Sequence, residues 1–279
     1  MEDSRVLLID CPDRKGLIAN ISGILFQYNL NVISNREFVS NDSNHFFMRT
    51  AFTGQFDESA LLSDLKKSLP EQASIRLIRQ AKKDIVIMVT KEHHCLSDLL
   101  VRHHFNELNA NIKAVISNYN NLKELTDKFA IPYYCVSHEG ISREEQESKV
   151  LELLKQFNPD YIVLAKYMRI LSPNFVSHFP GKIINIHHSF LPAFIGANPY
   201  RQAFERGVKI IGATAHFVND NLDEGPIIAQ SIIPVDHTHS AKDMTQAGRE
   251  IERQVLANSL KLALEDRIFI SKNKTIIFD

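Results

Sequence analysis

Three polar side chains mark the end of an apolar run in the second half of the chain. The run INIHHSFLPAF begins at Ile184 and presents Asn185, His187 and His188. Because successive side chains of a strand alternate between its two faces, Asn185 and His187 point the same way. An amide and an imidazole are thereby aimed at one spot. His188 alternates to the other face unless a turn at the strand end brings it back, so we expect it to have a supporting role only.

A second polar constellation follows within GATAHFVNDNLDEGPIIAQSIIPV, residues 212–235. We expect an alternating strand that carries His216, a polar loop over residues 219–225 and a second strand. Asp223 lies just before a Gly-Pro pair that fixes the shape of this loop. Taken alone, DEGP predicts a hairpin whose Asp caps its own turn. The upstream Asn185 and His187 favour a functional interpretation instead.

The elements that must position these side chains follow from short apolar runs between helical segments. One such helix is predicted over residues 143–157. Strands that alternate with helices predict an α/β domain with a doubly wound, mainly parallel sheet. Ligands bind beyond the carboxyl ends of the strands in such sheets, and INIHHS lies at one of these ends. The strands are expected at residues 83–90, 111–118, 132–137, 160–165 and 182–187.

The first 80 residues have a different pattern, which predicts a separate ferredoxin-like βαββαβ domain. Its strands are expected at residues 5–10, 31–40, 45–52 and 74–80, and its helices at residues 17–28 and 60–69. The segment that links this domain to the next is predicted at Gln80–Asp84. We therefore expect domains over residues 1–81 and 82–279.

Composition narrows the function classes. The 32 Lys and Arg nearly balance the 33 Asp and Glu, so no global field favours nucleic acid or anionic lipid. The three cysteines are widely spaced and lack a CxxC pair, which indicates a reducing compartment. No apolar run approaches the length of a membrane span. These features predict a cytoplasmic protein that acts on a small molecule.

Phosphate and metal sites are not expected. A nucleotide cradle needs glycines after the first strand of the sheet, and no glycine occurs between Gly54 and Gly140. Lys91, His93 and His94 remain able to pair with an anion. The pairs 93/94, 103/104 and 187/188 lack the spacing of metal-binding histidines, and His103 and His104 are expected on a partly exposed helix face.

The N-terminal domain resembles the ACT family of regulatory domains. The resemblance rests on LLIDCPDRKGLIANISGIL, residues 7–25, with its strand, its Asp- and Gly-containing turn and its helix. It implies a small effector, often an amino acid, bound near Asp10, Asp13 and Gly16 between paired domains, and hence a homo-oligomer. Gly16 at a helix start lets backbone N–H groups approach a carboxylate. The alternative is that Gly16 only forms a tight turn and that the domain only dimerises.

The second domain resembles the family of folate-dependent formyltransferases and deformylases. Its N-I-H strand and D-x-G-P loop match the family's catalytic trio at Asn185, His187 and Asp223. The resemblance implies supporting roles for His216, His188 and Gly225. Asn198 stands where the family often has Lys. The implied folate-binding residues are Tyr167, Met168, Arg169, Ile170 and Leu171 of YMRIL, together with Asn219.

The resemblance implies that 10-formyltetrahydrofolate is the substrate, with no tightly bound cofactor and no metal. Such chemistry needs a donor for the oxyanion, which Asn185 supplies, and a proton relay, which His187 supplies. Asp223 then either orients and biases His187 or holds the attacking water. Because no phosphate cradle is present, water is the expected acceptor. The products are then tetrahydrofolate and formate, which balances one-carbon pools and supplies purine synthesis. Two alternatives remain, namely formyl transfer to an unphosphorylated amine and an amino-acid sensor with an inactive catalytic domain.

Overall fold

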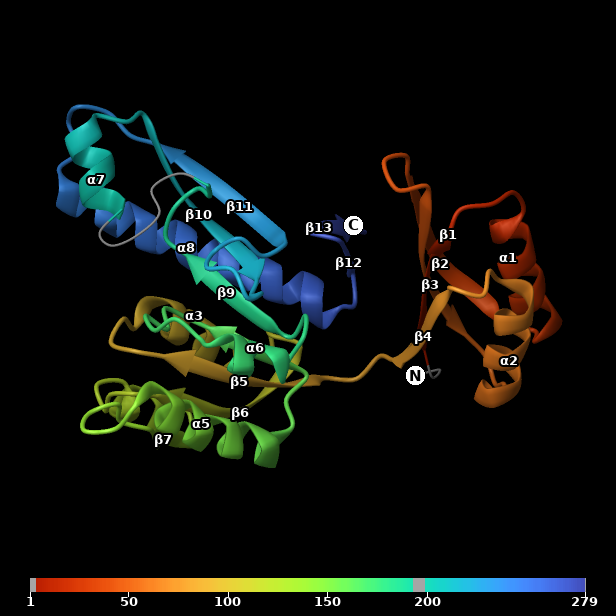
Figure 1. Ribbon diagram of the computed structural model, residues 1–279, viewed down its shortest axis with the longest axis horizontal. Helices are drawn as coiled ribbons and strands as arrows, with labels where there is room; N and C mark the ends of the chain where they lie inside the picture. The colour runs from red at the N-terminus through yellow and green to blue at the C-terminus, as the bar shows by residue number, and fades with distance from the viewer. Residues whose placement is uncertain (1–3, 193–198, 279) are drawn as a thin grey trace. The chain divides into compact units, whose positions relative to one another are not determined.

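The computed structural model describes residues 4–192 and 199–278, and these residues form two compact units. The first unit comprises the described residues up to Ala81 together with Phe278, and the second runs from Lys82 to Ile277. The first unit is red to orange in Figure 1, and the second is yellow to blue.

The first unit has the βαββαβ order predicted from the sequence. Its four-stranded sheet has the order β2–β3–β1–β4, and every pairing is antiparallel. Both helices pack on one face of this sheet (Figure 1), where they share a core with β1 and β3. The elements are β1 (Arg5–Pro12), α1 (Leu17–Gln27), β2 (Asn31–Ser40), β3 (His45–Thr53), α2 (Glu58–Ser68) and β4 (Ser74–Arg79).

Helix α1 begins at the predicted residue 17, whereas α2 begins at Glu58, two residues before its predicted start at residue 60. Gly16 precedes α1 in a left-handed conformation with φ 89°, which a glycine adopts without strain. Along α1, Leu17, Ile21 and Leu25 recur every four residues and are all buried, so one helix face meets the sheet. Asp57 caps α2 by accepting a hydrogen bond from the backbone N–H of Ala60 at 2.9 Å.

A seven-stranded sheet with the order β11–β10–β9–β8–β5–β6–β7 forms the centre of the second unit. The strands β9, β8, β5, β6 and β7 are parallel, whereas β10 is antiparallel to both β9 and β11. The chain returns after β7 to place β8 on the other side of β5, which creates a topological switch point. The strands are β5 (Lys83–Val89), β6 (Ala110–Ser117), β7 (Tyr133–Cys135), β8 (Tyr161–Leu164), β9 (Ile183–His187), β10 (Ile210–Phe217) and β11 (Ile227–Pro234).

Helices pack on both faces of this sheet, and alternate residues of the central strand belong to different cores. Ile85 and Ile87 lie in a core with α3 and α8, whereas Val86 and Met88 lie in a core with α5 and α6. The predicted doubly wound, mainly parallel architecture is confirmed. The helices are α3 (His94–His104), α4 (Lys123–Asp127), α5 (Arg143–Phe157), α6 (Pro173–Ser177), α7 (Pro199–Arg206) and α8 (Ala241–Leu264).

The long helix α8 begins with a capping box. The side chain of Ser240 accepts from the backbone N–H of Asp243, and the Asp243 carboxylate accepts from the backbone N–H of Ser240. A two-stranded sheet follows, formed by β12 (Ile268–Ser271) and β13 (Lys274–Ile277). Among the described residues, no helix combines the length and apolar character that crossing a bilayer requires.

Candidate active site

The candidate site lies where β8 and β9 end. Ile184 and Ile186 of β9 are buried in the core beneath α3 and α8. Because side chains alternate along the strand, Asn185 and His187 face the opposite side of the sheet, where a pocket opens. The structure thus places these two side chains together, as the spacing predicts.

Asp223 lies beside His187. Its Oδ2 is 3.3 Å from His187 Nδ1, and its Oδ1 is 3.7 Å from His216 Nε2. Burial alone would raise the pKa of Asp223, but the hydrogen bond from His187 outweighs burial and holds this pKa far below its usual range. Asp223 is therefore ionised at neutral pH, and it fixes a hydrogen on Nδ1 of His187.

His187 then has its second ring nitrogen available for chemistry. Nε2 of His187 is buried and has no hydrogen-bond partner among the described residues. With a hydrogen on Nδ1, Nε2 carries the lone pair of the neutral imidazole. The ring that carries this lone pair is part of the pocket wall.

His216 orients the amide of Asn185. Nδ1 of His216 is 2.9 Å from the backbone carbonyl of Phe217, which only accepts, so this nitrogen carries the hydrogen. Nε2 of His216 consequently accepts from the amide Nδ2 of Asn185 at 3.1 Å. One N–H of Asn185 is used in this way, and the amide nitrogen keeps a second N–H.

Gly225 allows the Asp223 loop to approach β10. A Cβ atom at position 225 would lie 1.7 Å from the backbone oxygen of Phe217, a distance that no side chain tolerates. Asp223 itself has a positive φ of 57°, in the left-handed region that Asp tolerates better than most residues. The supporting role expected for Gly225 therefore has a steric basis, because only glycine permits this approach.

His188 does not turn away from the site. The strand ends at His187, and the ring of His188 stacks on the ring of His187 with centroids 5.0 Å apart and an interplanar angle of 11°. The alternation along the strand stops before this residue, because the extended conformation ends at His187. The turn at the strand end brings its side chain back to the pocket.

The pocket holds about 520 Å³ and includes the predicted folate-binding segment. Met168 and Ile170 are 57% and 59% exposed, which is unusual for apolar side chains and leaves them available for contact with a ligand. The guanidinium of Arg143 donates to the Ile170 carbonyl at 2.7 Å and so anchors this segment. The predicted folate-binding residues Tyr167, Met168, Arg169, Ile170, Leu171 and Asn219 all line the pocket.

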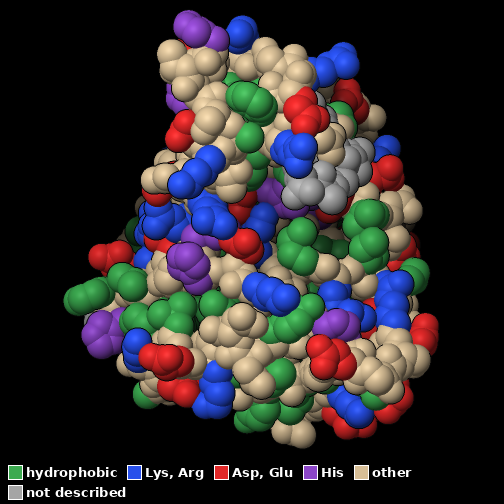
Figure 2. Space-filling model, turned by 90° about the vertical axis from the view of Figure 1, so that its left-hand side faces the viewer, with side chains coloured by type: hydrophobic (Ala, Val, Ile, Leu, Met, Phe, Trp, Pro, Cys, Tyr) green, Lys and Arg blue, Asp and Glu red, His purple; other side chains and the backbone are tan. Residues whose placement is uncertain are grey.

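Charged side chains of both signs are interspersed on the face of the molecule in Figure 2, with hydrophobic side chains among them. This agrees with the formal net charge of −1 at pH 7. The distribution fits a small-molecule site better than a surface for a polyanion.

Four buried polar residues lie next to the pocket, and the sequence pointed only to His94 among them, as able to pair with an anion. Lys166, Glu252, His94 and Tyr200 come from the end of β8, from α8, from α3 and from α7. Lys166 directly precedes YMRIL, and this position is the only local sign in the sequence that it lies near the site. The other three lie in ordinary helical segments, so their convergence becomes visible only in three dimensions.

In the same region, His94, Cys95 and Glu252 form the only group of three or more His, Cys, Asp or Glu side chains, among the described residues, whose ligand atoms are close enough together to hold a metal ion. Their donor set does not suit a metal. Burial raises the pKa of the Cys95 thiol, which keeps it protonated, and the ammonium of Lys166 lies 3.3 Å from Glu252. Lys166 already provides the positive charge that Glu252 needs.

The remaining predicted residues lie elsewhere. Asn198 is outside the described residues. Asp10 belongs to β1 and pairs with His45, with 3.5 Å between carboxylate oxygen and Nε2. Asp13 and Gly16 follow in the turn before α1. His103 is partly buried and His104 is exposed on α3, as expected for a helix face.

Family comparisons agree with both domains. The model of the family described as formyl transferase matches residues 83–260, and the model of the ACT domain matches residues 5–69. An ACT domain followed by a formyl transferase domain is thus the class that the fold and the site define.

Full-length relatives make the assignment more specific. The chain is 55% identical to a formyltetrahydrofolate deformylase of Haemophilus influenzae, over 99% of this chain and 100% of the relative. It is also 55% identical to one of Escherichia coli O6:H1, over 98% of each. The crystal structure of a formyltetrahydrofolate deformylase from Pseudomonas syringae superposes with a TM-score of 0.96 at 40% identity, covering 100% of this chain and 95% of that one. The chain belongs to the formyltetrahydrofolate deformylase family.

These relatives confirm the enzyme class predicted from the sequence, a folate-dependent hydrolase of one-carbon metabolism that acts on formyltetrahydrofolate. They do not favour the two alternatives, the amine-directed formyltransferase and the inactive sensor.

Proposed function

We propose that Asn185, His187 and Asp223 catalyse the hydrolysis of 10-formyltetrahydrofolate to tetrahydrofolate and formate. The observation that carries this proposal is the orientation of His187, whose Nδ1 is held by Asp223 while its buried Nε2 has no partner among the described residues. A neutral imidazole held in this way is suited to accept a proton from water.

In the first step, the oxygen of a water molecule attacks the formyl carbon while His187 Nε2 removes a proton from that water. The carbonyl oxygen becomes an oxyanion, and the second amide N–H of Asn185 stabilises it as a neutral donor. Asp223 stabilises the imidazolium that forms. Its low pKa makes Asp223 a poor base, so we assign proton removal to His187 and orientation to Asp223.

In the second step, the bond between the formyl carbon and N10 breaks, and its electron pair stays on N10. The imidazolium of His187 returns its proton to this nitrogen. The oxyanion collapses to formic acid, which loses its proton to give formate. The sequence of steps is balanced with water as the co-reactant, and it uses neither a metal nor a bound cofactor.

The pterin end of the substrate is placed against Tyr167–Leu171 and Asn219 in this proposal. These residues line the same pocket as His187, and Met168 and Ile170 offer apolar surface to a flat ring. The segment has no regular secondary structure, and apart from the Ile170 carbonyl, which accepts from Arg143, its main-chain groups are available for hydrogen bonds to the ring.

The test is formate release from 10-formyltetrahydrofolate in buffer free of amine acceptors. We expect release by the wild type, a loss of about 100-fold or more in kcat for His187→Ala and Asp223→Ala, and retained folate binding. Glu224→Ala is the matched control, since it removes an exposed carboxylate from the adjacent position. Near-normal turnover by either active-site variant refutes the assignment, whereas formate release only after addition of an amine supports the transferase alternative.

The N-terminal unit is proposed to regulate this activity by binding an amino acid at Asp10, Asp13 and Gly16, in a homo-oligomer located in the cytoplasm. A Cβ atom at Gly16 would meet no atom within 4 Å, so the start of α1 has room for a carboxylate. Control is useful because unrestrained hydrolysis would drain the formyl-folate pool. Calorimetry with common amino acids tests the effector, and a monomer mass by light scattering argues against the oligomer.

A further inference from the structure

Behind His188 lies a buried chain of charged and polar side chains. The ammonium Nζ of Lys166 is 2.9 Å from Nδ1 of His188 and 3.3 Å from Oε2 of Glu252. All three residues are buried, with exposed fractions of 8%, 8% and 1% for Lys166, His188 and Glu252. An ammonium only donates, so Nδ1 of His188 accepts from Lys166.

Glu252 is held as the counter-ion of Lys166. Its Oε1 accepts from the hydroxyl of Tyr200 at 2.6 Å, and its Oε2 is 2.7 Å from Nε2 of His94. Burial alone would raise the pKa of Glu252, but the hydrogen bond from His94 and the charge of Lys166 lower this pKa to about 2. Glu252 is thus a carboxylate at neutral pH, and it stabilises the charged form of Lys166.

Two residues that each cost local stability, Lys166 and Gly248, maintain this arrangement. Lys166 has a φ of 65°, in the left-handed region where glycine would be free of strain. Gly248 lies inside helix α8, where glycine costs stability relative to alanine, yet a Cβ atom there would be 2.1 Å from Cζ of Tyr200. The lysine side chain and the gap at position 248 are both needed to build the contacts of Glu252.

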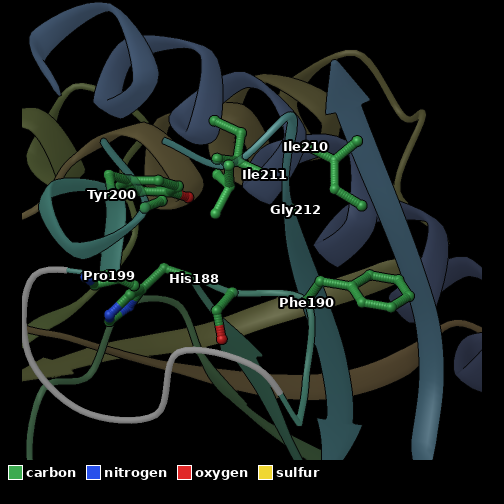
Figure 3. Close-up of a pocket in the computed structure, with 10 residues that line it drawn as sticks. His188, Phe190, Pro199, Tyr200, Ile210, Ile211 and Gly212 are labelled. Atoms are coloured by element: carbon green, nitrogen blue, oxygen red, sulfur yellow. The ribbon is translucent and has the colours of Figure 1, made fainter. Parts of the chain in front are cut away.

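His188 connects this buried chain to the active site. Its ring stacks on that of His187 with centroids 5.0 Å apart, and it lies 6.3 Å from the ring of Tyr200. Figure 3 shows His188 from the turn after β9 and Tyr200 from α7 beside a mostly apolar cavity of about 180 Å³. His188 therefore separates the catalytic pocket from an apolar region.

We propose that Lys166 is a positioning residue that keeps His188 uncharged, so that the proton removed from water is taken up by His187 alone. Two stacked imidazoles compete for one proton, and two imidazolium rings at this distance repel each other. By occupying the Nδ1 lone pair of His188, Lys166 removes that competition. The inference rests on the proposed role of His187 as the base.

The charged groups that face the rings of His187 and His188 determine in which direction each variant should shift their protonation. Lys166 on the β8 side opposes protonation of the pair, and Glu252 on α8 favours it. Tyr200 on α7 and His94 on α3 act through Glu252 as hydrogen-bond partners. On the other side of His187, Asp223 favours its protonation, and His216 is engaged with Asn185.

Two more charged groups lie beyond His94. Nδ1 of His94 is 3.6 Å from Glu92, and Arg249 donates to Glu92 at 2.9 Å. These two residues balance each other's charge and remain unchanged in the variants below.

The experiment compares the pH dependence of kcat/KM for formate release among charge-removal variants. A base must be uncharged, so activity falls on the acid side. Lys166→Met removes the cation and leaves Glu252, and we expect the acid limb to move up by about one pH unit. Glu252→Gln leaves the ammonium of Lys166 without its counter-ion, so the acid limb should move to lower pH. Opposite shifts distinguish an electrostatic role from a structural one.

The variant Lys166→Met/Glu252→Gln removes both charges, which avoids an unpaired buried ion, and its acid limb should lie between those of the single variants. Lys83→Met is the matched control, because Lys83 forms a similarly enclosed ion pair with Asp266 at the start of β5. Its acid limb should match that of the wild type.

Imidazole nitrogen NMR gives a second readout that needs only folded protein. The wild type should show His188 with its hydrogen on Nε2, and the double variant should show His188 gaining a second proton in mild acid. Acid limbs of the two single variants that coincide with that of the wild type, or an unchanged His188 signal in the double variant, overturn the inference. If His187→Ala also remains active, the proposed function fails as well, so the two failures are distinguishable.

Discussion

Replacing Gly225 by alanine is expected to impair catalysis through geometry alone. The added Cβ would lie 1.7 Å from the backbone oxygen of Phe217, whereas ordinary contacts begin near 3.4 Å. The loop must therefore move away from β10 by about 1.5 Å. Asp223 lies two residues away and is already 3.3 Å from His187, so this movement breaks their hydrogen bond.

The size of the effect follows from this displacement. A misplacement of about 1 Å at an active site costs about 100-fold in rate, so we expect kcat of Gly225→Ala to fall by at least that factor. Overpacking against rigid backbone also costs about 1–3 kcal/mol of unfolding free energy. Formate release measures the first quantity, and urea denaturation measures the second.

Gly23→Ala is the matched control for this substitution. Gly23 lies within α1, where a Cβ atom would meet no atom within 4 Å, so alanine should increase stability by about 0.5–1 kcal/mol and leave turnover unchanged. A Gly225→Ala protein with wild-type kcat would show that the position of the Asp223 loop does not control catalysis.

Two further predictions concern stability. Glu252 has a folded-state pKa lowered to about 2 from an ordinary value of 4.5, so its contribution to the stability of the protein is complete above about pH 5 and is lost as the pH falls toward 2. Glu252→Gln should therefore flatten the dependence of unfolding free energy on pH in that window, as measured by urea denaturation at several pH values. Ser240→Ala removes the capping box of α8 and should lower the unfolding free energy by about 1 kcal/mol, and an unchanged denaturation midpoint would contradict this role of the cap.

The sequence predicts the fold well because each element carries its own signal. Short apolar runs separated by amphipathic segments indicate strands and helices of the second unit, and residues 143–157 form a helix with the predicted bounds. The orientation of β10 could not be predicted in this way. Strand direction depends on which edges pair in space, and the pattern of GATAHFV is the same for either direction.

The site was predictable where its residues follow one strand and not where they converge from different elements. Asn185 and His187 share a face because of the period of a strand. Glu252 lies 158 residues after His94 in the sequence, and helical periodicity predicts only that each has a buried face. For His188 the sequence left two placements open, because the end of a strand is a matter of one residue, which the pattern does not resolve.

The antiparallel pairing of β10 gives the site a dependence on register that a wholly parallel sheet would not have. His216 lies opposite Asn185, and Thr214 lies opposite His187. A one-residue slip would turn His216 to the other face and leave the amide of Asn185 without its acceptor. A bulge fixes this register on the other side of β10, where Ala215 pairs with Ala229 and His216 with Ile227. The same bulge lies at the base of the loop that carries Asp223, so one irregularity in the sheet helps to position both the proposed oxyanion donor and the proposed partner of the base.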